Sequence, residues 1–148
     1  MRIVVLGALG AILLAGLCVA PAGAKEQTLA AEANGQVSFV MPSDNVDCIY
    51  TPEGGTPTYT PQNGGPELSC DRAAPTYVNV RLGPGAPAEV TPDPGEQPCC
   101  GGTNTFAYGN TATLGTAFIC ASSKTGLVCQ TTDQLHGFSI SRAKILNH

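Results

Sequence analysis

The chain lacks tryptophan and has few other aromatic residues. Its 148 residues include four Phe and four Tyr, so aromatic residues make up 5% of the sequence. Aromatic side chains bury the largest area per residue, and a core built with so few of them is thin. The sequence therefore predicts that something besides hydrophobic burial holds the fold together.

Charge is also scarce, because charged residues make up 12% of the chain and the formal net charge is −4. The basic residues are scattered and form no cluster. Nucleic-acid binding requires a positive face, so we expect no nucleic-acid partner.

Metal ligands are few. The chain has two histidines, one of which is the last residue, and no Cys-x-x-Cys pair. Zinc sites use several Cys and His ligands at short, regular spacings. Glycine pairs such as Gly101-Gly102 lack the lysine and following helix of a phosphate-binding loop. We therefore expect no metal site and no cofactor.

The first 24 residues have the order of a secretory signal. Arg2 is followed by an uncharged, almost wholly apolar run over residues 3–20, then Pro21 and Ala22-Gly-Ala24. This order predicts cleavage after Ala24 and a secreted or periplasmic product. An uncleaved membrane anchor is the alternative, because a run of about 18 apolar residues can span a bilayer. A lipoprotein anchored through Cys18 is disfavoured, because Leu17 stands where a small residue belongs. No later segment predicts membrane insertion.

Six cysteines follow residue 24, and an even number in a short exported chain predicts a disulfide framework. They are Cys48, Cys70, Cys99, Cys100, Cys120 and Cys129. A tight turn over residues 123–126, with Gly126 at positive φ, would place Cys120 directly opposite Cys129. Opposed residues of antiparallel strands lie within disulfide range, so this pair is predicted to bond.

The other four cysteines are less constrained. Cys48 and Cys70 flank a loop rich in Gly and Pro, and a bridge between them would join the ends of that loop. Cys99 and Cys100 either bond to each other or cross-pair with another bridge, because six cysteines allow 15 connectivities.

Short alternating segments predict an all-β fold, either a sandwich or a barrel of antiparallel strands. No segment shows helical periodicity over ten residues, and the residues show no internal repeat. Residues 51–67 and 83–98, each with eight Gly or Pro, are predicted loops. The domain plan is a signal peptide over 1–24, a flexible arm over 25–35 and one disulfide-stapled domain over 36–148. Strands are predicted over residues 36–41, 47–50, 76–82, 104–108, 114–120, 127–130 and 136–141, with a last strand or turn over 143–147.

Several segments resemble a family of small exported bacterial proteins of unknown function. The first is Phe39-Val-Met-Pro-Ser-Asp-Asn-Val-Asp-Cys48, which is similar to the family's Phe-x-x-Pro-Ser-x-Asn-Ile/Val-x-Cys start. The end, His136-Gly-Phe-Ser-Ile-Ser-Arg142, is similar to the family's His-Gly-Phe-x-x-Ser-Arg ending, although Leu135 replaces a glycine before the histidine. The family's third cysteine soon after Cys70 is absent. The resemblance implies export, disulfides and a compact β domain, and it implies no activity.

His136 is the one weak candidate for a catalytic residue, with Asp133 and Ser139 three residues to either side. A triad requires its members to converge in space. On an extended strand Ser139 points to the face opposite His136, so a structural histidine is favoured and the protein is expected not to be an enzyme.

The expected function is a non-enzymatic binding or envelope-associated module whose ligand is unknown. The loops over 51–67 and 83–98 are candidate surfaces for a protein or a small ligand, because long loops are often functional. Two alternatives remain, a small secreted hydrolase that uses His136 and a secreted protease inhibitor that presents the loop over 51–67.

Overall fold

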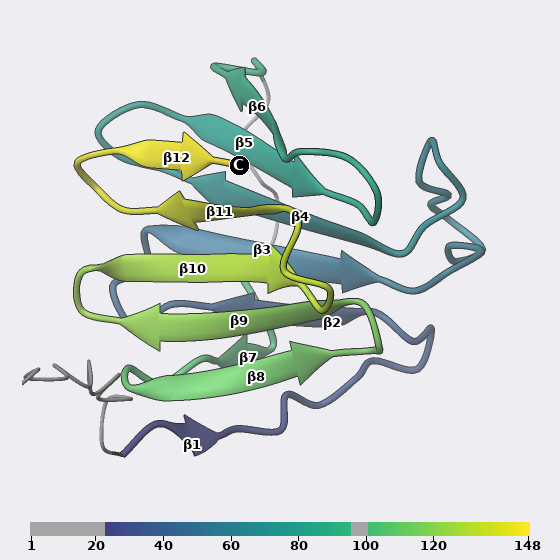
Figure 1. The fold of residues 1–148 in the computed structure, drawn as a ribbon, viewed down its shortest axis with the longest axis horizontal. Helices are drawn as coiled ribbons and strands as arrows, with labels where there is room; N and C mark the ends of the chain where they lie inside the picture. Colours follow the sequence, from purple (N-terminus) through teal and green to yellow (C-terminus); the bar gives the residue numbers. More distant parts are fainter. Residues whose placement is uncertain (1–22, 96–100) are drawn as a thin grey trace, which may run out of the picture.

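The computed structural model describes residues 23–95 and 101–148, and these form two stacked β-sheets (Figure 1). The front sheet has the order β1-β8-β9-β10-β11-β12 and the rear sheet the order β6-β5-β4-β3-β2-β7. The front strands are β1 (Lys25–Glu26), β8 (Asn110–Leu114), β9 (Phe118–Ser123), β10 (Gly126–Thr131), β11 (Gly137–Ile140) and β12 (Ile145–Asn147). The rear strands are β2 (Val37–Val40), β3 (Val46–Thr51), β4 (Glu67–Arg72), β5 (Val78–Leu82), β6 (Glu89–Pro92) and β7 (Asn104–Thr105).

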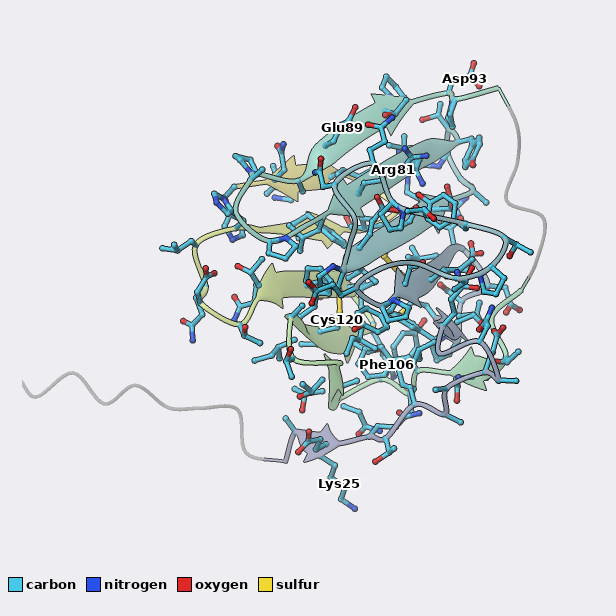
Figure 2. The ribbon with its side chains drawn as sticks, turned by 90° about the vertical axis from the view of Figure 1, so that its right-hand side faces the viewer. Lys25, Arg81, Glu89, Asp93, Phe106 and Cys120 are labelled. Carbon is cyan, nitrogen blue, oxygen red and sulfur yellow. A yellow bond between two sulfur atoms is a disulfide. The ribbon has the colours of Figure 1, made fainter. Side chains whose placement is uncertain are left out.

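The predicted all-β class is confirmed as an open sandwich of two sheets rather than a closed barrel. Seen edge-on in Figure 2, the layers enclose side chains that include those of Phe106 and Cys120. The described ranges contain no helix able to span a membrane.

The two halves of the chain follow one plan, although the residues show no repeat. Each half starts with a two-residue strand, β1 or β7, and continues as a five-stranded antiparallel meander, β2–β6 or β8–β12. Each short strand crosses over to pair in parallel with the first strand of the other meander, β1 with β8 and β7 with β2. The halves are therefore interlocked at the edges of both sheets.

Each meander carries one disulfide between its second and third strands. Cys48–Cys70 joins β3 to β4, and Cys120–Cys129 joins β9 to β10, with 4.1 Å between the Cα atoms of each pair. Both pairs are directly opposed in register and fully buried. The predicted Cys120–Cys129 pairing is confirmed, including the turn at Gly126 with φ +143°, and the Cys48–Cys70 bridge that the sequence left open is formed. Cys99 and Cys100 lie outside the described residues.

The core lies between the sheets because alternate residues of each strand point inward. Its largest fully buried side chains are the four phenylalanines, Phe39, Phe106, Phe118 and Phe138. Phe39 packs edge to face on Phe106 with ring centroids 5.5 Å apart, and Tyr50 packs likewise on Phe118 at 6.1 Å. Both contacts join one half to the other.

Some strand predictions were wrong, and each for a local reason. The predicted strand over 114–120 runs across the turn between β8 and β9, in which Gly115 has φ +55°, and the rest of β8 was not predicted. Strand β4 was missed because only one of its inward residues, Leu68, is a typical strand apolar, the others being Cys70 and Arg72. The predicted loop over 83–98 contains β6, an edge strand on which Pro92 is tolerated at the end.

Residues 25–35, the predicted arm, contact the other half of the chain. Leu29 belongs to the core. The Gln27 side chain donates to the Thr105 carbonyl at 2.8 Å and accepts from the Ala107 amide at 3.0 Å. Asn104 exchanges two hydrogen bonds with the backbone of Ala30, at 2.9 and 3.0 Å.

Candidate functional site

The two ends of the sandwich are built differently. Four turns, over residues 41–45, 73–77, 124–125 and 141–144, lie at the end on the left of Figure 1, which we name the turn end. The long loops over 52–66 and 83–88 lie at the opposite end, which we name the loop end and which faces the viewer in Figure 2.

A pocket of about 430 Å³ opens at the turn end, and we name it the turn-end pocket. Its apolar lining includes Met41, Val46, Tyr108 and Ile140. Val46 begins β3 in the rear sheet and Ile140 ends β11 in the front sheet, so the pocket lies at strand ends that belong to both sheets. Ligand pockets typically have volumes of roughly 300–1,000 Å³ and combine an apolar lining with a few polar groups.

The polar lining comes from the turns. Lys124 and Thr125 project from the β9–β10 turn, and Ser141 and Arg142 from the β11–β12 turn. The Ser141 hydroxyl donates to the Lys144 carbonyl at 3.0 Å and accepts from the Lys144 amide at 3.1 Å, which fixes the second turn. Lys124 and Arg142 are exposed at the mouth. Lys144 lines an adjoining hollow of about 250 Å³.

Arg72 lies behind the polar lining of the pocket. It faces inward at the end of β4, with 6% of its surface exposed. Its Nη1 donates across the gap between the sheets to the Ser141 carbonyl at 3.1 Å, and its Nη2 lies 3.3 Å from the Thr76 hydroxyl. Its Nε is buried and has no hydrogen-bond partner among the described residues. The guanidinium therefore places a buried positive charge beside the turn-end pocket.

The carboxylate side chains near the turn end face away from the pocket. Asp47 and Asp71 are opposed across β3 and β4 on the outer face of the rear sheet, since their neighbours Cys48 and Cys70 face inward. Asp71 accepts from the Tyr77 hydroxyl at 2.9 Å and from the Asn79 amide at 3.0 Å. Burial, and then the charge of Asp71, raise the pKa of Asp47 to about 6. Asp44 is exposed in the turn before β3 and does not line the pocket.

The loop end brings the two predicted contact loops together. They line a second cleft of about 340 Å³ that also includes Glu67 and Arg81. The Tyr59 hydroxyl donates to the Glu67 carboxylate at 2.6 Å, and burial together with this bond raises the pKa of Tyr59 to about 12. Figure 2 shows Arg81 and Glu89 on neighbouring strands here, where they are opposed in register.

His136 lies in the turn between β10 and β11, also at the loop end. Its Nδ1 is buried and has no hydrogen-bond partner among the described residues. Asp133 instead accepts from the Thr131 hydroxyl and the Leu135 amide, and the Thr131 bond is the main reason that its pKa is lowered. Ser139 faces outward on β11, opposite Val128. The structure therefore does not bring these three residues together as a triad.

The turn-end pocket was missed by sequence reasoning, because its lining comes from four separate segments. One local signal existed, since Lys124, Arg142 and Lys144 all lie in turns that follow predicted strands.

The comparisons with known proteins add no relative. No protein-family model, no curated protein and no solved structure matches this chain.

Proposed function

We propose that this protein is a non-enzymatic binding module that works outside the cytoplasm, as a secreted or periplasmic protein, and that it takes its ligand in the turn-end pocket. The observation that carries the proposal is the pocket itself, which joins an apolar floor to polar and cationic groups from two turns. The two buried disulfides support the compartment, because such bonds persist where the environment is oxidising.

The attachment of both turns to paired strands also supports binding. Both turns that carry the polar lining connect paired strands, β9 with β10 and β11 with β12. The Cys120–Cys129 bridge lies within the first of these hairpins. A preformed site loses little conformational freedom when a ligand binds.

The test is a screen of small molecules against the ¹⁵N-labelled protein, read by amide chemical shifts. We expect the shifts to gather on residues 41–46, 108, 123–126 and 140–143. Ala143→Trp, which fills the pocket from an exposed position, should abolish them, whereas Thr58→Trp at the loop end should not. Hits confined to the loop end, or turnover of a substrate that is lost in His136→Ala, would overturn the proposal.

A second candidate is a protease inhibitor that uses the loop over residues 52–66. The Cys48–Cys70 bridge brackets this loop, and the loop is fixed internally by bonds from the Gly54 amide to the Gly64 carbonyl and from the Thr56 amide to the Tyr59 carbonyl. Tyr59 is 39% exposed near its tip. Titration against a panel of proteases tests this candidate, and Tyr59→Ala should weaken any inhibition found.

A further inference from the structure

We infer that the ligand of the turn-end pocket is an anionic amphiphile, that is, an acidic group joined to a short apolar chain. This inference rests on the proposed function and specifies its ligand class. It follows from how charge and apolar surface are distributed over the molecule.

The basic residues gather at the turn end, although the chain as a whole carries a net negative charge. The chain has a net charge of −4, and only six basic residues follow residue 24. Four of these six surround the turn end, namely Arg72, Lys124, Arg142 and Lys144. Lys25 and Arg81 lie elsewhere.

These four cations are not neutralised by the protein. None of them forms an ion pair with a carboxylate of the described residues. Within residues 23–95 and 101–148, no acidic residue lines the turn-end pocket or the hollow beside it. Asp44 and Asp47 each adjoin lining residues in sequence, but Asp44 is exposed in its turn, and Asp47 and Asp71 lie on the outer face.

Arg72 strengthens the attraction for an anion. A buried charge interacts through a medium of lower effective dielectric constant than water, and a buried cation without an ionic partner is costly. Because its guanidinium holds the Ser141 carbonyl in the pocket wall, an anion bound at Ser141 and Arg142 would offset part of that cost.

The apolar floor excludes a bare inorganic anion as the best fit. Met41, Val46 and Ile140 are buried and Tyr108 is half-buried. None of these lining side chains offers a charged group, so an apolar chain packs against them at less cost than a second charged group would. The acidic group would therefore lie at the mouth near Lys124 and Arg142, with the chain directed between the sheets.

The experiment compares four probes by isothermal titration and amide shifts: octanoate, octan-1-ol, octylammonium and acetate. We expect octanoate to bind at the turn end, octan-1-ol and acetate to bind about tenfold more weakly, and octylammonium not to bind there. Lys124→Gln and Arg142→Gln should each weaken the affinity for octanoate about threefold. The double variant should weaken it about tenfold, as expected for partly exposed ion pairs. Arg81→Gln at the loop end is the matched control and should change nothing.

Several outcomes would overturn the inference. If octan-1-ol binds at the turn end as tightly as octanoate, or if the two substitutions leave octanoate binding unchanged, the ligand class is wrong while the proposed binding function stands. If none of the four probes shifts the turn end, the ligand class is also wrong, and the wider screen alone decides the proposed function.

A final experiment distinguishes two sources of the amphiphile, a free acid and a membrane lipid. Vesicles of phosphatidylglycerol and of phosphatidylcholine are tested by sedimentation. If the protein binds octanoate but neither kind of vesicle, its ligand is a free acid. Binding to phosphatidylglycerol vesicles that octanoate competes away indicates an anionic lipid. Both results support the inference, whereas binding to the two vesicles alike contradicts it.

Discussion

The two halves of the molecule, residues 25–92 and 104–147, use the same order of strands and the same disulfide position but differ in what surrounds the disulfide. In the first half, Phe39 and Val80 flank the Cys48–Cys70 bridge in register, whereas Ala112 and Phe138 flank the Cys120–Cys129 bridge in the second half. Each row thus holds one phenylalanine, but on different strands. Alternating large and small residues across facing layers is one way to fill a core without voids.

The connections and outer faces differ more than the cores. Fifteen residues, 52–66, link β3 to β4, while two residues link β9 to β10. On the outer face, the Asp47–Asp71 pair of the first half corresponds to Ile119–Gln130 in the second. Thus the same backbone plan occurs in the two halves with different loops and different surface charge.

The largest loss of stability is expected when the packing between the two halves is disrupted. Phe106→Ala removes a fully buried ring that packs on Phe39, and we expect a loss of about 4 kcal/mol in the free energy of unfolding. Urea unfolding measures it, with Phe106→Leu as the milder control. A loss below about 1 kcal/mol would show that the interface is not a shared core.

Removing either disulfide should destabilise the fold, but by different amounts in the two halves. The bridges span 22 and 9 residues, and the chain-entropy model gives losses of about 3.4 kcal/mol for Cys48→Ala/Cys70→Ala and about 2.6 kcal/mol for Cys120→Ala/Cys129→Ala. Urea unfolding of both double variants tests the order. A larger loss for the second bridge would mean that native packing, not loop length, sets its contribution.

The glycines of the two hairpins should differ in the same assay. At Gly126, with φ +143°, an added Cβ would lie 2.4 Å from the Ile140 carbonyl oxygen, whereas at Gly54, with φ +82°, no atom lies within 4 Å. We expect Gly126→Ala to cost about 2–3 kcal/mol and Gly54→Ala about 1 kcal/mol. Equal losses would show that the tight turn relaxes around the methyl group.

The smallest change in stability is expected at the Asp47–Asp71 carboxylate pair of the first half. The folded-state pKa of Asp47, about 6, lies above its ordinary value of 3.8, so its contribution to stability is fully present below about pH 3.8 and is lost as the pH rises through about 6. Asp47→Asn should therefore stabilise the fold at pH 7 by about 1 kcal/mol, reduced for its partial exposure, and by nothing near pH 3.5.

Thermal unfolding across this pH range measures the effect of Asp47→Asn. Glu89→Gln, which removes an exposed carboxylate elsewhere, is the control. A stabilisation by Asp47→Asn that is the same at both pH values would exclude titration of Asp47 as its cause.

Sequence patterns predicted the local features of the fold well, because turns and adjacent strands depend on neighbouring residues. The β9–β10 hairpin followed from Gly126 and the spacing of Cys120 and Cys129. The pairing of β1 with β8 and of β7 with β2 could not be predicted, since strands of two residues carry no periodicity and their partners lie far away in sequence.

The site was less predictable than the fold. The turn-end pocket is lined by strand ends and turns from both sheets, and residues such as Met41 and Tyr108 show no sign in the sequence of facing one space. Arg72 in particular lies at an inward strand position, where the alternation rule predicts an apolar residue. By contrast, the proximity of the two Gly/Pro-rich loops follows from their place between successive antiparallel strands.

The crossed short strands also determine when the protein can finish folding during synthesis. Lys25 and Glu26 pair only with Asn110 and Thr111, some eighty residues downstream, and contacts so distant in sequence form late. The earliest residues of the domain must therefore wait for the last third of the polypeptide to emerge, and a ribosome that stalls between the two meanders would leave a fragment with an uncovered sheet edge.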